Sequence, residues 1–286
     1  MSATLVFHIS HVRVEVQSDE PAVLRGMRAA WLPAVAPVVE IRRTVRFKTE
    51  ARTWGHEIRI DGAVRSVAED PDVALPMLDA AVHMELRAWH ESHAGVALLR
   101  AAMLQGPEGA LLLLGESGAG KTLLARAAIE RGYLYGSDEL SVSSDTRVWG
   151  VARTPQLHVM RRHDPLPIWL AGADTKSYRL RAGGLEAGVL PLFPVPGAQV
   201  LRAPGFVARS HVVLLSQGQS DRVEALDAMR GLTAIHQASL LPPSALLGRL
   251  VRPGHIWRLQ WRNPQTALAR LEAALREAEV SQHRLQ

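Results

Sequence analysis

Residues 111–139 read LLLLGESGAGKTLLARAAIERGYLYGSDE, and the order of residue types in this stretch decides the fold. An apolar run precedes the pattern G-x-x-x-x-G-K-[ST], and a helical pattern follows it, which is the context that a phosphate-binding loop requires. Small residues let backbone N–H groups turn towards a phosphate chain, and a helix N-terminus adds the positive end of its dipole. The stretch therefore predicts a phosphate site formed by Gly115, Glu116, Ser117, Gly118, Ala119, Gly120, Lys121 and Thr122.

Two side chains of this loop have separate expected roles. Lys121 supplies a point charge for the β- and γ-phosphates, and the hydroxyl of Thr122 is suited to a Mg²⁺ ligand. ATP and Mg²⁺ are therefore the expected cofactors. The alternative is a glycine-rich turn that merely starts a helix, and the ordered succession of strand, loop, lysine, threonine and helix argues against it.

A pair of acids, Asp138 and Glu139, follows the loop and its helix. A helix over about 121–130 would end at Gly132, a residue suited to a left-handed C-cap. Residues 133–135 then indicate a short strand parallel to the apolar strand before the loop. The acids would lie at its carboxyl end, where ligands bind in open α/β sheets. They suit a metal contact and a proton acceptor, and the alternative is a helix cap or a solvated loop pair.

The loop, the Arg-Gly pair at 131–132 and the acid pair at 138–139 resemble, in order and spacing, the catalytic domain of HPr kinase/phosphorylase and its relatives. The chain is most similar to the HPr-kinase-related group, some of which phosphorylate serine on ribosomally made peptides such as lasso-peptide precursors. The resemblance covers roughly residues 96–145. It implies an α/β fold, with a P-loop kinase domain of the HPr kinase type over residues 93–286.

The resemblance also implies roles for single residues. Asp138 falls on the catalytic base of the family, and Glu139 falls on the second acid, where the bifunctional enzymes have Asp. The family places a His fifteen residues before the first glycine of the loop, and here that residue is Arg100. Arginine stays protonated and cannot act as a base, although it can place a fixed charge near phosphate. We therefore expect catalytic roles for Asp138, Lys121 and Arg100, metal contacts from Thr122 and Glu139, and no phosphorylase activity.

Composition narrows the class of protein. The chain has 286 residues, of which 47% are hydrophobic, so it is long enough and apolar enough to form a proper core. A formal charge of +5 suits anionic ligands such as ATP but is too weak and dispersed to indicate nucleic-acid binding. There are no cysteines, no evident signal peptide and no apolar stretch long enough for a membrane span. We expect a cytoplasmic protein.

Residues 1–92 are predicted to form a small α+β domain that binds a substrate or partner. Asp19 and Glu20 before Pro21 mark a helix start, and Asp61-Gly62 marks a hairpin turn. The remaining expected elements are a strand or pair of strands in 4–16, strands in 38–49 and 56–60, and a helix in 73–90.

The expected catalytic domain, 93–286, has fewer clear periods. Residues 153–205, rich in Pro and Gly, are predicted to be loops around an active site. Asn263-Pro264 is a good N-cap and N1 pair for a helix that ends near residue 280. The expected strands of this domain, besides those around the loop, are 96–104, 212–215 and 256–261.

Two further groups of polar residues have alternative interpretations. Alternation over residues 42–48 places Arg42, Thr44, Arg46 and Lys48 on one face of a strand, which would receive an acidic peptide or be an ordinary solvated face. The histidine pairs do not favour a metal site: His90 and His93 have no evident third ligand, and His8 and His11 would lie on opposite sides of one strand. One of the cations after the acids is expected near the γ-phosphate: Arg153, Arg161, Arg162, Lys176, Arg179 or Arg181.

Three functions remain open from the sequence. The first is an ATP- and Mg²⁺-dependent kinase of a serine or threonine in a peptide or small protein, with Asp138 as proton acceptor. The second is a kinase of a small hydroxylated metabolite. The third is a nucleotide-dependent switch or ATPase, against which the acid pair argues, together with the absence of an acid after the 212–215 strand. No membrane partner is expected, and a homo-oligomer is expected by analogy with the family alone.

Overall fold

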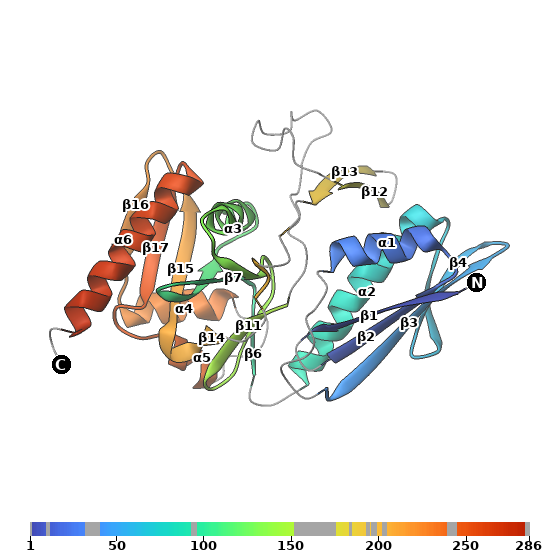
Figure 1. Ribbon diagram of the computed structural model, residues 1–286, viewed down its shortest axis with the longest axis horizontal. Coiled ribbons are helices and arrows are strands. Elements are labelled where there is room, and N and C mark those ends of the chain that lie inside the picture. Colours follow the sequence, from blue (N-terminus) through green and yellow to red (C-terminus); the bar gives the residue numbers. More distant parts are fainter. Residues whose placement is uncertain are drawn as a thin grey trace. The chain divides into compact units, whose positions relative to one another are not determined.

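The protein has a mixed α/β fold, as expected (Figure 1). In this computed structural model the chain divides into two compact units, Met1–Trp89 with Ala152–Gly197, and His90–Val151 with Ala198–Gln286. The roles predicted for the two parts of the chain stay predictions. The structure describes residues 2–9, 12–31, 41–92, 96–151, 176–182, 185–192, 195, 199–201, 205–238 and 245–283.

A five-stranded sheet forms the centre of the first unit, in the order β1-β2-β3-β4-β5. The β2–β3 pair is parallel and every other pair is antiparallel. A parallel pair needs a crossover, and helix α1 (Pro21–Ala30) lies in that connection. The other elements are β1 (Ala3–Ile9), β2 (Val12–Ser18), β3 (Arg43–Arg52), β4 (Gly55–Ile60), β5 (Ala63–Ala68) and α2 (Pro71–Glu91).

Local sequence signals account for much of this unit. The left-handed residues Asp61 and Gly62, with φ of 48° and 87°, make the predicted hairpin turn between β4 and β5. The helix predicted after Glu20 begins at Pro21. Trp31, directly after α1, stacks on Phe7 of β1 with ring centroids 5.7 Å apart. The bounds of strand β5, which follows this turn, were not predicted, because its sequence, AVRSVA, has no regular alternation.

The basic face predicted on residues 42–48 is an ion-paired surface. Arg46 pairs with Glu15 at 3.0 Å, and Lys48 pairs with Glu50. Arg59 on the neighbouring strand pairs with Glu57 at 2.6 Å. These cations already have carboxylate partners, so the structure favours the solvated-face alternative over a peptide site here.

A six-stranded sheet forms the centre of the second unit, in the order β16-β17-β15-β8-β7-β9. Strands β8, β15 and β17 run parallel, and the buried apolar runs in β8 and β15 are typical of such strands. The strand bounds are β7 (Ala101–Gly106), β8 (Gly109–Leu114), β9 (Leu134–Ser137), β15 (Ser210–Gln217), β16 (Arg222–Ala225) and β17 (Ile256–Trp261).

Helices cover both faces of this sheet (Figure 1). Helices α3 (Lys121–Glu130) and α6 (Pro264–His283) pack on each other and on strands of the sheet. The other face buries Leu112, Val212 and Ile256 with Ile235 of α4 (Ala228–Ala238) and Leu250 of α5 (Ala245–Leu250). Asn263 is the predicted cap of α6, since its Oδ1 accepts the Gln265 N–H at 2.9 Å. Strands β12 (Lys176–Ala182) and β13 (Leu185–Leu192) belong to the first unit and pair as an antiparallel hairpin, so the prediction of loops was wrong for these residues.

The prediction of one strand over 96–104 was wrong, because the chain changes sheets at Arg100. Leu99 pairs with Ser141 in a second, four-stranded sheet, whereas Ala101 pairs with Leu114 in the large sheet. The backbone N–H of Arg100 donates to the Ala238 carbonyl at 2.8 Å. The residues on both sides of Arg100 are all apolar, so the sequence pattern does not reveal this break. The second sheet contains β6 (Ala97–Leu99), β10 (Ser141–Ser143), β11 (Arg147–Gly150) and β14 (Gly205–Phe206).

A buried histidine pair lies at the opposite end of β15 from Gln217. The rings of His211 and His255 stack with centroids 4.7 Å apart, and His211 is only 2% exposed. Burial, followed by the neighbouring charges of His255 and Arg252, lowers the pKa of His211 to about 4, although a hydrogen bond with the Glu108 backbone acts in the other direction. The imidazole is therefore neutral in the folded protein near neutral pH.

Acidification should destabilise the protein through His211. Because the folded-state pKa lies below the ordinary value of 6.5, the unfolded chain binds this proton first. The stabilisation that the neutral His211 contributes to the folded state is fully present above about pH 6.5 and is lost as the pH falls towards 4. Between pH 7 and pH 5 the loss should be about 2 kcal/mol. Urea unfolding of the wild type and of His211→Gln at both pH values measures it, and an identical pH dependence in the two proteins would contradict the assignment.

Candidate active site

The ends of four strands, β7, β8, β9 and β15, lie together at one end of the large sheet. Leu114, the last residue of β8, pairs with Ala101 of β7 on one side and with Leu214 of β15 on the other. Arg100 therefore lies beside the start of the 115–120 loop. Strand β9 pairs with β7 through Met103 and Ser137, so the acids that follow β9 lie at the same end of the sheet as the loop. Strand β9 runs in the same direction as β8, as predicted, but β7 lies between them.

The 115–120 loop adopts a backbone that its glycines permit. Gly118 and Gly120 have φ of 83° and 93°, in the left-handed region that side chains rarely adopt. At Gly120 there is a second reason for glycine, because an added Cβ would collide with the Trp261 ring. Helix α3 then begins at Lys121 and ends at Glu130, and Gly132 has φ of 90°, as the sequence predicted.

The first turn of α3 offers backbone donors. The first hydrogen bond of the helix runs from Leu124 N–H to Gly120 O at 3.0 Å. The amides of residues 121–123 therefore have no acceptor within the helix, and Gly120 provides no side-chain cap. Unpaired amides at a helix N-terminus after a glycine-containing loop fit the phosphates of a nucleotide.

Lys121 folds back over the loop. Its Nζ donates to the carbonyls of Gly115 at 2.6 Å and Glu116 at 2.9 Å. Burial, followed by the Arg100 charge, lowers the pKa of Lys121 below its ordinary value, whereas Glu139 and Asp138 act in the opposite direction. The pairing of strands therefore places the four charged residues predicted at the site close enough for their charges to influence Lys121.

Two buried serines fix the turn that holds the acids. The hydroxyl of Ser141 donates to the Ala101 carbonyl at 2.9 Å, and the hydroxyl of Ser137 lies 3.0 Å from that of Ser141. Both serines are fully buried, while Asp138 and Glu139 between them are half-buried. The turn is thus anchored to the first residue of β7, next to Arg100.

Two residues that the sequence did not single out hold the loop from neighbouring strands. The indole N–H of Trp261 donates to the Ala119 carbonyl at 2.8 Å, and the Gln217 amide donates to the Gly118 carbonyl at 3.0 Å. Gln217 and Trp261 are paired in register at the ends of β15 and β17. Their position as the last residues of parallel strands was the one signal that could have identified them.

The remaining predicted site residues differ in their exposure to solvent. Thr122 is half-buried, while Glu116 and Ser117 are exposed. No cluster of three His, Asp or Glu suited to a metal occurs within the part of the chain that the structure describes. Side chains of the cations predicted near the γ-phosphate, and of His93 and His11, lie outside the described residues. Among the described helices, none has the length and apolar character to cross a bilayer.

Comparisons with known proteins add little to this geometry. No family model matches the chain, and no curated protein matches it. Among solved structures, the HPr(Ser) kinase/phosphatase from Coxiella burnetii matches at 13% identity, over 65% of this chain and 98% of that chain, with a TM-score of 0.25. A match this weak supports no conclusion about activity, which has to be inferred from the residues of the site.

The Trp261→Phe substitution keeps an aromatic ring but removes the hydrogen bond to the Ala119 carbonyl, so it should destabilise the protein. The expected loss is about 1 kcal/mol in the free energy of unfolding, measured in urea. Trp257 is a matched control on the same strand, because it is 6% exposed against 5% for Trp261 and its Nε1 has no partner in the described structure. Trp257→Phe should leave the hydrogen bonding intact, so equal losses in the two variants would contradict a bracing role for the Trp261 N–H.

Proposed function

We propose that the chain is an ATP- and Mg²⁺-dependent kinase that transfers the γ-phosphoryl group to a serine or threonine hydroxyl of a peptide or small protein. The observation that carries this proposal is the strand pairing that places Arg100 and the turn with Asp138 and Glu139 at the end of the sheet where the loop with Lys121 begins. Cations beside unpaired helix amides suit phosphate, and acids beside them suit a metal ion and a hydroxyl proton.

Each group has a distinct role in this proposal. Lys121 and the amides of residues 121–123 hold the phosphates, with Arg100 as an additional fixed cation. Thr122 and Glu139 would hold Mg²⁺, which would neutralise charge on the phosphates. The acceptor oxygen attacks the γ-phosphorus as the bond to the β-phosphate oxygen breaks, and Asp138 accepts the hydroxyl proton. The products are ADP and a phosphoester.

The position of the acids favours transfer over a nucleotide-dependent switch. Many P-loop ATPases hold Mg²⁺ through an acid that follows another strand of the sheet. Here the last residues of β15 are Ser216 and Gln217, and Gln217 braces the loop instead. The acids come from the turn after β9, and in this proposal one of them accepts the hydroxyl proton. A peptide acceptor, rather than a metabolite, and a homo-oligomeric state follow only from the resemblance to the HPr-kinase-related group.

Lys121→Ala should abolish phosphoryl transfer while the protein stays folded, because the half-buried ammonium contacts the loop rather than the apolar core. At Mg·ATP one hundred times above its dissociation constant, the wild type should gain about 2.7 kcal/mol of stability, and the variant far less. Thermal unfolding with and without Mg·ATP measures this gain. Lys48→Ala, on the ion-paired face of the first unit, is the control and should keep the full gain. An active Lys121→Ala protein would overturn the phosphate-site assignment.

Asp138→Asn should remove transfer but spare Mg·ATP binding, because the amide keeps the size of the side chain and loses its basicity. General-base assistance contributes roughly 10²–10⁴ in rate. Transfer of labelled γ-phosphate to a library of serine-containing peptides measures the rate, and thermal stabilisation by Mg·ATP measures binding. Glu139→Gln is the matched variant and should raise the Mg²⁺ requirement instead. A loss below about fivefold in Asp138→Asn would exclude Asp138 as the base.

A further inference from the structure

Strand β1 is an edge strand without the usual protection. It pairs with β2 on one side, and no strand in the described part of the chain pairs with its other side. Its sequence, ATLVFHI, contains no acid, lysine, arginine, proline or glycine. The opposite edge strand, β5, carries the exposed Arg65 and a register shift against β4. Exposed edges normally carry such charges or irregularities, because a free edge pairs with other strands.

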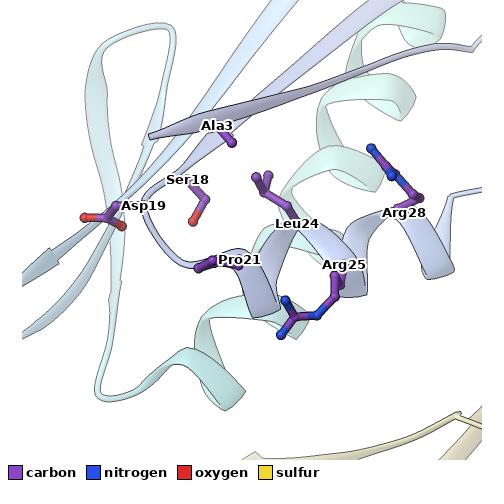
Figure 2. Close-up of a pocket in the computed structure, with 7 residues that line it drawn as sticks. All are labelled: Ala3, Ser18, Asp19, Pro21, Leu24, Arg25 and Arg28. Carbon is purple, nitrogen blue, oxygen red and sulfur yellow. The ribbon is translucent and has the colours of Figure 1, made fainter. Parts of the chain in front are cut away.

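A pocket of about 160 Å³ lies beside the start of β1 (Figure 2). Helix α1 packs on β1 and β2, and Leu24 provides an apolar surface between the helix and the strand that carries Ala3. Arg25 and Arg28 extend from the same helix. The lining residues are Ala3, Ser18, Asp19, Pro21, Leu24, Arg25 and Arg28.

The pocket carries a net positive charge, because its two arginines outnumber its one carboxylate, Asp19. Asp19 accepts the Ala51 N–H at 3.2 Å, and Ser18 Oγ accepts the Glu20 N–H at 3.0 Å, so both polar groups are already engaged. Arg25 and Arg28 are exposed and form no hydrogen bond or ion pair with any described residue. They differ in this respect from the arginines on the outer face of the same sheet, which have glutamate partners.

A second copy of the chain is a poor occupant of this edge. Antiparallel pairing of β1 with β1 of a second copy would be related by a two-fold axis perpendicular to the sheet. Both α1 helices would then lie on the same face of the joined sheet, which would carry the arginines of both copies. Like charges brought together oppose such an association.

We infer that the free edge of β1 and the adjacent pocket bind an extended acidic peptide segment. Its backbone adds a strand to the sheet by hydrogen bonding to β1, and an acidic side chain enters the pocket against Arg25 and Arg28. Main-chain bonds supply affinity, and the two arginines select for acid. This surface is independent of the proposed phosphoryl transfer and would bind the peptide even if that proposal failed.

Fluorescence anisotropy of the full chain tests this inference. The probe is a labelled nine-residue peptide of alternating valine and threonine with two glutamates, and a matched peptide has lysines in place of the glutamates. The acidic probe should bind the wild type, the basic probe should bind at least tenfold more weakly, and the Arg25→Gln/Arg28→Gln variant should lose about tenfold in affinity for the acidic probe. Glutamine keeps the helix propensity at both positions. Hydrogen exchange at residues 3–9 should slow when the acidic probe binds.

Arg65→Gln is the matched control, since it removes an exposed arginine from the opposite edge of the same sheet. It should bind the acidic probe like the wild type. Equal affinity for the two probes, an unaffected Arg25→Gln/Arg28→Gln variant, or unchanged exchange at residues 3–9 would each overturn the inference. Sedimentation of the wild type and of Val6→Glu tests whether a second copy of the chain occupies the edge instead. A wild type that is dimeric and a Val6→Glu variant that is monomeric would assign the edge to a second copy.

Discussion

The pairing of Leu114 with Ala101 on one side and Leu214 on the other is the constraint on which the site depends. It sets where β8 ends relative to its neighbours, and hence which residues surround the loop that follows. Leu114 and Ala101 are fully buried and Leu214 is partly buried, so this pairing is part of the packed interior of the sheet. The same burial that stabilises the sheet therefore positions Arg100 and the acid-bearing turn beside the loop.

The loop itself is held by bonds from outside its own segment. Trp261 and Gln217 donate to two consecutive carbonyls of the loop, and Lys121 donates to two others. These bonds engage four carbonyls of the loop, whereas the amides of residues 121–123 have no acceptor within the helix. Such an arrangement favours an anion over a cation, and the acids on the adjacent turn then provide a place for a metal and a proton.

The first unit shows that the partners of an arginine matter more than its presence. The outer face of the sheet carries Arg46 and Arg59, each beside a glutamate, and this face has little charge left for a ligand. Arg25 and Arg28 have no such partners among the described residues, and they flank an edge strand with free backbone groups. A ligand with its own carboxylate therefore gains most binding energy at the surface formed by Arg25, Arg28 and the edge of β1.

Local features were predictable from the sequence because they depend on neighbouring residues. The loop and the helix over 121–130, the left-handed Gly132, the turn at Asp61-Gly62 and the cap at Asn263 follow from backbone preferences and short-range periodicity. Only the tertiary structure decided the break at Arg100, the place of β7 between β8 and β9, and the bracing of the loop by Trp261. That bond joins residues 142 positions apart, and a contact at such a distance depends on how strands pair, which no local pattern specifies.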